Sequence, residues 1–169
     1  MWKEQERKWL DNIPLIVQQL VESWNLSNLN VLSDLTYNYI LSGYQNSLPI
    51  ILKLSGDKQA LSLEAEMLEL YQGNIFVRLI SKNLEMGALL IERVIPGTTL
   101  SELFPDRDTQ AVGHASSIIK QINNYPRHYS QLNLSKYPTV ATWLKVLDHE
   151  YNIPTEYLTK AQMLKANNC

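Results

Sequence analysis

Apolar residues in the first two dozen positions recur every three or four residues, the spacing of one side of an α-helix. The stripe consists of Ile13, Ile16, Val17, Leu20 and Trp24. The pattern predicts helix over residues 2–24 in two pieces, because Asp11 or Asn12 can cap a second piece whose first turn then contains Pro14. We expect the stripe to pack against the rest of the protein.

Three strand-like runs follow, over residues 28–32, 37–41 and 49–54. Ser33-Asp34 separates the first two runs, and the segment from Gly43 to Ser47 separates the last two. Short polar or glycine-containing breaks between such runs are typical of hairpins. The pattern therefore predicts an antiparallel meander of three strands.

A helix and two more strands are expected next. Ser55-Gly56-Asp57 breaks the strand pattern and can cap a helix over residues 58–71, which Gly73-Asn74 then ends. Two further apolar runs predict strands near 75–81 and 87–94. The sheet would then have five strands, with one helix inserted after the third.

Pro96-Gly97 marks a change, because only helical patterns follow it. The expected helices cover residues 100–104, 106 or 108 to 123, 139–150 and 155–167, with a loop over 126–138. This order predicts an α+β protein with a kinase-like small lobe, followed by the helical start of a large lobe. The expected divisions are N-terminal helices over 1–26, a small lobe over 27–95, a hinge over 96–100 and helices over 101–169.

Composition narrows the classes of partner and compartment. The net charge is −2 and both signs are interspersed, so we expect neither nucleic acid nor an anionic membrane as a partner. The single cysteine, Cys169, excludes a disulfide within the chain and indicates a reducing, cytoplasmic setting. No apolar run approaches the roughly 18 residues of a membrane span.

Lys53 is the first candidate for chemistry, because it lies inside the apolar run Ile-Ile-Leu-Lys-Leu. A charge there must reach water or find a partner. Lys53 either extends from the strand into solvent or neutralises nucleotide phosphates in company with a glutamate of the next helix. Glu64 falls on the stripe of that helix with Leu61, Leu68 and Tyr71, so it is either the partner of Lys53 or an exposed residue at the stripe edge.

The other candidates follow from position along the sheet. Glu92 and Val94 are the positions at the end of the fifth strand where the backbone of a two-lobed kinase holds adenine; otherwise Glu92 and Arg93 are a charged pair that marks a strand end. Ser33 and Thr36 lie in the first hairpin turn and could donate hydrogen bonds to phosphate, although that turn lacks a G-x-G-x-x-G sequence and could be a plain polar hairpin.

No metal site is expected from the histidines. His114, His128 and His149 each lack a second His or Cys at the spacing of metal ligands, so we expect them to be surface residues.

Four segments together resemble the aminoglycoside and hydroxyurea resistance kinases, which include streptomycin 6-kinases. Residues 9–17, followed by Leu20, Trp24 and Leu26, are similar to the opening W-L-x-x-L-P-x-L-V…W-x-L of that family. The other three matches are residues 51–54 to V-L-K-L, 64–68 to E-A-x-x-L, and 87–100 to G-A-L-L-L-E-R-x-x-P-G-x-x-L. The last block is the most specific, and the four matches follow one another in order between residues 9 and 100.

The resemblance implies a kinase-like fold, ATP with Mg²⁺ as cofactors, and transfer of the γ-phosphoryl group to a hydroxyl of a small-molecule acceptor. It makes Lys53 the phosphate-binding lysine and Glu64 its partner. Family members also carry an H-G-D-x-x-x-x-N catalytic loop and a later Asp that binds Mg²⁺. No histidine of this chain precedes Gly-Asp, so no catalytic or metal-binding residue is predicted and turnover by the chain alone is expected to be negligible.

Three interpretations follow. The chain is a shortened family member that ends at Cys169 before the catalytic loop, a kinase-like module kept for docking to a partner, or one half of an enzyme made of two chains. On the first interpretation the later helices would lack part of their cover, which predicts exposed apolar surface and self-association. The predicted apolar residues are Ile118, Ile119, Ile122, Trp143, Leu144 and Leu147.

Overall fold

The structure is a computed structural model that describes residues 2–32, 38–125, 133–148 and 155–168. The chain divides into two compact units, the first from Met1 to Arg127 and the second from His128 to Cys169. The predicted hinge over 96–100 lies within the first unit, so it does not coincide with the boundary between the compact units.

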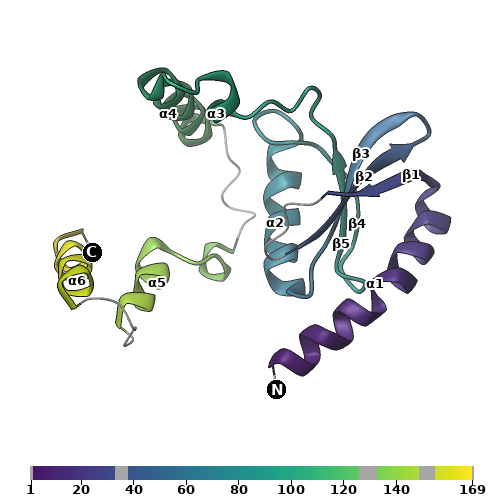
Figure 1. Ribbon diagram of the computed structural model, residues 1–169, viewed down its shortest axis with the longest axis horizontal. Coiled ribbons are helices and arrows are strands. Elements are labelled where there is room, and N and C mark those ends of the chain that lie inside the picture. Colours follow the sequence, from purple (N-terminus) through teal and green to yellow (C-terminus); the bar gives the residue numbers. More distant parts are fainter. Residues whose placement is uncertain (1, 33–37, 126–132, 149–154, 169) are drawn as a thin grey trace. The chain divides into compact units, whose positions relative to one another are not determined.

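The first unit contains a mixed set of helices and strands (Figure 1). Its elements are α1 (Trp2–Trp24), β1 (Leu26–Val31), β2 (Tyr39–Gln45), β3 (Leu48–Leu54), α2 (Lys58–Tyr71), β4 (Leu79–Asn83), β5 (Ala88–Glu92), α3 (Leu100–Leu103) and α4 (Asp108–Asn124). The second unit contains η2 (Leu134–Lys136), α5 (Val140–Leu144), η3 (Lys145–Asp148) and α6 (Thr155–Asn168). The predicted α+β class, with five strands and one helix after the third, is confirmed.

The five strands form one antiparallel sheet in the order β1-β2-β3-β5-β4. Strand β3 lies in the middle, between β2 and β5. In its register Lys53 is opposite Ile40 on β2 and opposite Leu89 on β5. The central strand therefore carries the charged residue that the sequence singled out.

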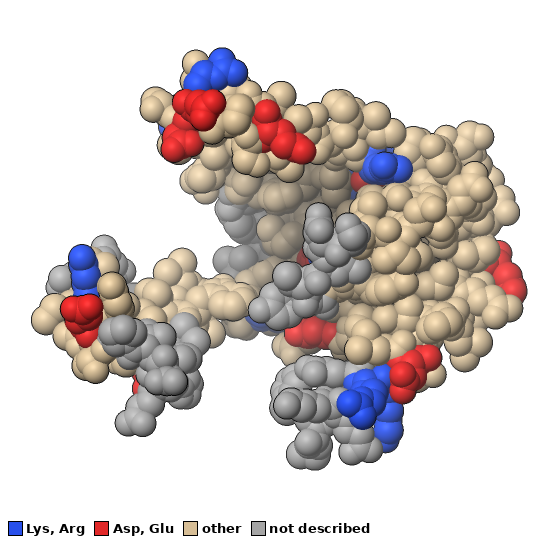
Figure 2. All heavy atoms as spheres, in the orientation of Figure 1, with Lys and Arg blue, Asp and Glu red and all other residues tan. Residues whose placement is uncertain are grey.

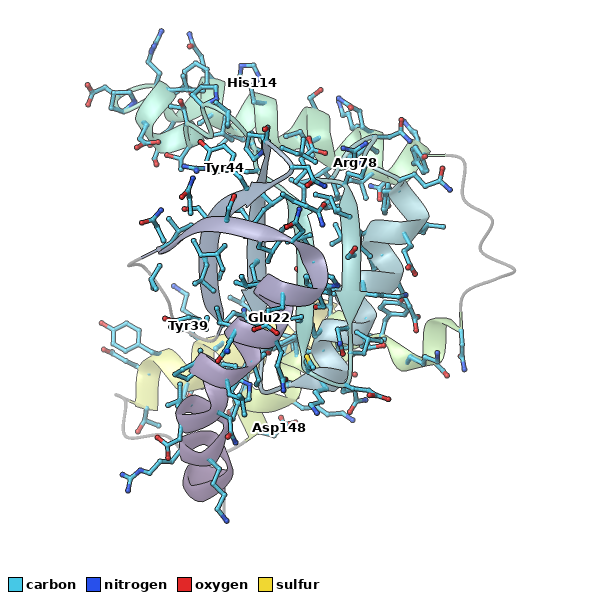
Figure 3. All side chains as sticks on the ribbon, turned by 90° about the vertical axis from the view of Figure 1, so that its right-hand side faces the viewer. Glu22, Tyr39, Tyr44, Arg78, His114 and Asp148 are labelled. Atoms are coloured by element: carbon cyan, nitrogen blue, oxygen red, sulfur yellow. The ribbon has the colours of Figure 1, made fainter. Side chains whose placement is uncertain are left out.

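Helices cover the two faces of the sheet (Figure 3, seen from the α1 side). Alternate residues of a strand point to opposite faces, so Ile50, Leu52 and Leu54 pack toward α1 while Lys53 points toward α2. The core on the α1 side contains Ile13, Leu20, Leu26, Leu41, Ile50, Leu52, Leu54, Ala88 and Leu90. The core on the α2 side contains Leu61, Ala65, Leu68 and Leu89. The sheet is thus the middle layer of the unit.

Helix α1 is one helix, and the predicted break into two pieces is wrong. Pro14 lies inside it rather than at the start of a second helix. Proline lacks the N–H that would bond to the carbonyl four residues earlier, which weakens the helix at this point. Ile13 and Leu20 are both buried in the sheet core, so packing along the whole stripe offsets that local cost.

The turn between β2 and β3 is shorter than predicted. Gly43 to Gln45 continue strand β2, and only Asn46 and Ser47 form the turn. Both turn residues have positive φ, 46° and 71°, as a two-residue hairpin turn that follows the strand twist requires. The glycine that suggested a turn serves another purpose: a Cβ at Gly43 would lie 2.5 Å from Leu29 Cδ2, so glycine permits close packing of β1.

Strand β4 begins at Leu79, four residues later than predicted. The apolar run from Ile75 was assigned to the sheet, but the Phe76 ring packs edge-on against Tyr71 at 4.7 Å between centroids. Phe76 therefore covers the end of helix α2 rather than a face of the sheet. Helix α2 itself ends as expected, with Gln72 and Gly73 in the left-handed region at φ 50° and 79°.

Candidate functional site

Lys53 and Glu64 form an ion pair in the first unit. The Lys53 Nζ atom donates to both carboxylate oxygens of Glu64, at 2.8 Å and 2.6 Å. The Lys53 side chain is 17% exposed and the Glu64 side chain 37% exposed. Lys53 therefore does not simply extend into water, and the predicted pairing with Glu64 is confirmed. Its role toward a nucleotide stays a prediction.

Helix α2 explains why Glu64 reaches the strand. Asp57 caps the helix, because its carboxylate accepts a hydrogen bond from the Ala60 N–H at 2.9 Å. The buried side of the helix is Leu61, Ala65, Leu68 and Tyr71. Glu64 lies next to Ala65 at the edge of this stripe. Its carboxylate is therefore not packed against the apolar residues and can bind the Lys53 ammonium group. Glu64 therefore lies at the edge of the stripe and also pairs with Lys53, although the sequence presented these two features as alternatives.

A second lysine–glutamate pair joins the same helix to the sheet. Lys82 on β4 lies 2.6 Å from Glu69 on α2, measured from Nζ to Oε1. Its side chains are 36% and 49% exposed, against 17% and 37% for Lys53 and Glu64. Lys82 is on an edge strand, whereas Lys53 is on the central one. The two pairs share chemistry but differ in burial, which makes Lys82 a matched control for Lys53.

Glu92 and Val94 lie at the end of β5. The Glu92 N–H donates to the Arg78 carbonyl at 3.0 Å. The Arg78 N–H donates to the Glu92 carboxylate at 3.2 Å rather than to the Glu92 carbonyl. Within the described ranges, no hydrogen bond engages the Val94 N–H, and the Val94 side chain is exposed. A backbone donor and a backbone acceptor are therefore present at this strand end.

The sequence reasoning missed Arg78 as the partner of Glu92. The Arg78 side chain adds a weak charge contact, with its Nε atom 4.0 Å from Glu92 Oε2. Opposite charges at the facing ends of the fourth and fifth strands were the available signal. The predicted strand over 75–81 contains Arg78, whereas β4 begins one residue after it, at Leu79, and leaves the Arg78 N–H to the Glu92 carboxylate.

The α2-side face of the sheet is partly open between Lys53 and the end of β5. Helix α2 packs against β4 and β5. On the same face of the neighbouring strands, Ile51 and Ile40 are half-buried while Leu32 and Tyr44 are exposed. Figure 3, seen from the α1 side, labels Tyr44 and Arg78 at one end of the sheet; Tyr39, near the other end, packs on the α1-side core instead. From the Glu92 end toward Lys53, this strip of β2 and β3 therefore contains Tyr44, Ile51 and Ile40, with the buried hydroxyl residue Ser42 opposite Ile51.

The length of this strip follows from the register. Ile50 is opposite Glu92 and Lys53 lies three residues further along β3. Three residues of extended strand span about 10 Å. A ligand on this face would therefore need a flat apolar part and an anionic part about that far apart.

Of the remaining predicted residues, only His114 lies in the part of the chain that the structure describes. Ser33 and Thr36 lie outside the described residues, as do His128 and His149. The His114 ring stacks on Phe104 at 5.1 Å between centroids, in the α3–α4 region. In the part of the chain that the structure describes, no group of three or more His, Cys, Asp or Glu residues is arranged to hold a metal ion.

Charge is mixed over the molecular surface. On the face drawn in Figure 2, Lys and Arg side chains lie beside Asp and Glu side chains and do not gather into one basic patch. Among the helices described, none is both long and apolar enough to cross a lipid bilayer.

Comparison with known proteins identifies no family. The chain matches no protein-family model, and no curated protein matches it significantly.

Proposed function

We propose that the first unit binds ATP or a closely related purine nucleotide on the α2-side face of its sheet, through Lys53. One observation carries the proposal: a lysine of the central strand, 17% exposed, is held by both oxygens of a helix glutamate beside a partly open apolar face. An ammonium group oriented in this way can neutralise phosphate oxygens. Glu64 keeps the Lys53 side chain in place before a ligand arrives.

The other end of the same face suits a purine base. Adenine presents an N–H donor and a ring-nitrogen acceptor on one edge, which the Glu92 carbonyl and the Val94 N–H can complement. Ile51 and Ile91 offer apolar contact to the flat base. The separation of about 10 Å along β3 matches the reach from a base across its ribose to the first phosphates.

The sheet arrangement supports the same proposal. Five antiparallel strands with one helix between the third and fourth are the small-lobe arrangement that the family resemblance implies. On this basis the chain would be related to phosphotransferases that act on hydroxyls of small molecules such as aminoglycosides. The chain contains no H-G-D-x-x-x-x-N sequence, and its described residues include no group of three or more His, Cys, Asp or Glu arranged to hold a metal ion. We propose that it binds nucleotide without phosphorylating an acceptor by itself.

Turnover gives a simple first experiment. Purified chain with ATP, Mg²⁺ and streptomycin should form no labelled product above a Lys53→Ala control, because no base orients the acceptor hydroxyl. A lysine-dependent burst of phosphorylated streptomycin would contradict the proposal that this chain is inactive alone.

Mapping by NMR tests the binding face. Titration of isotopically labelled protein with ATP should shift the amide signals of Ile51, Lys53 and Val94. The amide of Leu20, which is buried in α1 on the other side of the sheet, should not move. No shifts at millimolar ATP, or shifts confined to the α1 side, would refute the proposed site.

A docking function is the second candidate, and exposed apolar side chains favour it. In the first unit Ile119 of α4 is 56% exposed, and in the second unit Trp143 of α5 is 70% exposed. Exposed apolar residues of this size often mark contacts with other proteins. Nucleotide binding that is lost in Lys53→Ala would show that docking is not the sole function.

A further inference from the structure

A cluster of aromatic rings joins helix α4 to the C-terminal end of α2. Tyr71, the last residue of α2, is 1% exposed. Its ring lies 4.7 Å from that of Phe76 and 4.9 Å from that of Tyr125, between centroids. Tyr125 is the C-terminal cap residue of α4. The end of one helix therefore packs directly on the end of the other.

Hydrogen bonds reinforce this contact. The Asn74 side-chain amide donates to the Tyr71 carbonyl and to the Tyr125 hydroxyl, both at 2.9 Å. The Tyr125 hydroxyl in turn lies 3.5 Å from the Tyr71 carbonyl and can donate to it. The last carbonyls of a helix lack partners within that helix, so these bonds stabilise the end of α2.

Helix α4 contributes no buried residue of its own. Tyr125, by contrast, is half-buried and reaches α2 with both its ring and its hydroxyl. The tyrosine therefore supplies a specific attachment for a helix whose own residues are half-buried or exposed. A change in the position of α4 would act on α2 through this attachment.

Glu64 lies on the same side of α2 as Tyr71. Seven residues separate them, which is close to two helical turns and about 10 Å along the axis. A helix of this length moves as a stiff rod, so a tilt or rotation at Tyr71 displaces Glu64. The Lys53–Glu64 hydrogen bonds at 2.8 Å and 2.6 Å depend on that position.

We propose that Tyr125 is a positioning residue that sets the Lys53–Glu64 ion pair by holding the end of α2. The consequence for nucleotide binding rests on the function proposed above, whereas the effect on the ion pair does not. Events at α4, such as contact with a partner, would then reach the phosphate-binding lysine through Tyr125, Tyr71 and the length of α2.

The reactivity of the Lys53 amine tests this directly and needs no nucleotide. A short pulse of an amine-acylating ester, followed by peptide mass spectrometry, reports how well each lysine is held. Glu64→Gln gives the reference for a weakened pair. We expect Tyr125→Ala to raise Lys53 labelling about threefold, toward the Glu64→Gln value, because the glutamate is no longer held in register.

Lys165 serves as the internal control. It is paired with Asp148 at 2.6 Å in the second unit, and its side chain is 21% exposed, close to the 17% of Lys53. Its labelling should not change in Tyr125→Ala. Tyr125→Phe, which keeps the ring contact, should show a smaller increase at Lys53 than Tyr125→Ala.

The double variant decides whether Tyr125 acts through Glu64. In a Glu64→Gln background, Tyr125→Ala should add no further increase at Lys53. Wild-type labelling of Lys53 in folded Tyr125→Ala would overturn the proposal, and so would an equal added increase in the Glu64→Gln background. If Tyr125→Ala does not fold, Asn74→Ala, at an exposed position, decides by the same criteria. All outcomes hold even if the protein binds no nucleotide, so the two proposals fail separately.

Discussion

Single residues in this chain show which chemical signals can be read without a structure. A lysine inside an apolar strand has to find a partner, and the helix that follows offers a glutamate beside its apolar stripe. The Lys53–Glu64 pair was therefore predictable from the sequence. The hydrogen bond from the Arg78 N–H to the Glu92 carboxylate was not predictable. It depends on where β4 begins, which the sequence pattern did not show.

The capping box of α3 makes a prediction about pH. The Thr99 N–H and hydroxyl donate to the Glu102 carboxylate at 2.7 Å and 2.9 Å, and these bonds lower the pKa of Glu102 below its ordinary value. A carboxylate with a lowered pKa in the folded state contributes stability above its unfolded pKa and loses it as pH falls through the folded pKa. Carbon-detected NMR titration should show this low value and a rise toward the ordinary one in Thr99→Ala. An ordinary pKa in the wild type would contradict the cap.

Gly43 provides a test of strand packing. An added Cβ would lie 2.5 Å from Leu29 Cδ2 and 2.9 Å from the Ser27 carbonyl oxygen. Gly43→Ala should therefore lower the free energy of unfolding by about 1–3 kcal/mol, measured by urea denaturation. Gly113→Ala is the control, because no atom lies within 4 Å of its added Cβ and alanine favours a helix. A loss in Gly113→Ala, or none in Gly43→Ala, would contradict the packing described.

At the scale of elements, the existence of each helix and strand was easier to predict than its ends. Two residues that usually mark the end or start of an element lie inside one here: Pro14 lies inside α1, and Gly43 lies inside β2. In both places contacts from distant residues, with the sheet core and with β1, override the local preference. Phe76 shows the same effect, because its contact with Tyr71 delays the start of β4.

Helix α1 should gain stability when its proline is replaced. Pro14→Ala restores the N–H that can bond to the Leu10 carbonyl and removes the ring from the helix interior. We expect the free energy of unfolding to rise by about 1 kcal/mol or more, measured by urea denaturation. Destabilisation by Pro14→Ala would mean that α1 is not continuous through this position.

At the scale of the whole molecule, the predicted exposure of apolar side chains is confirmed for several residues. Ile118 and Ile119 of α4 are 45% and 56% exposed in the first unit, and Trp143 of α5 is 70% exposed in the second. The helical pattern predicted which residues form the stripes. Whether such a stripe is covered depends on which other elements pack against the helix. The hydrophobic pattern of the helix itself does not contain that information.

Exposed apolar surface of this kind predicts self-association. Sedimentation velocity should show a weight-average sedimentation coefficient that rises with protein concentration, because burial of apolar area favours association. The double variant Ile119→Lys with Trp143→Gln should reduce that rise, since both side chains are exposed in their own units. A monodisperse monomer at all concentrations, with no binding of a hydrophobic dye, would contradict the prediction.

The central claim is that Lys53 binds nucleotide phosphate, and a comparison of two lysines tests it most directly. Affinity for fluorescent ADP should fall at least about tenfold in Lys53→Ala, because a charge-assisted contact is lost. It should stay unchanged in Lys82→Ala, which breaks the similar Lys82–Glu69 pair at the edge of the sheet. Equal affinities for the wild type and both variants, or equal losses in the two variants, would contradict the account.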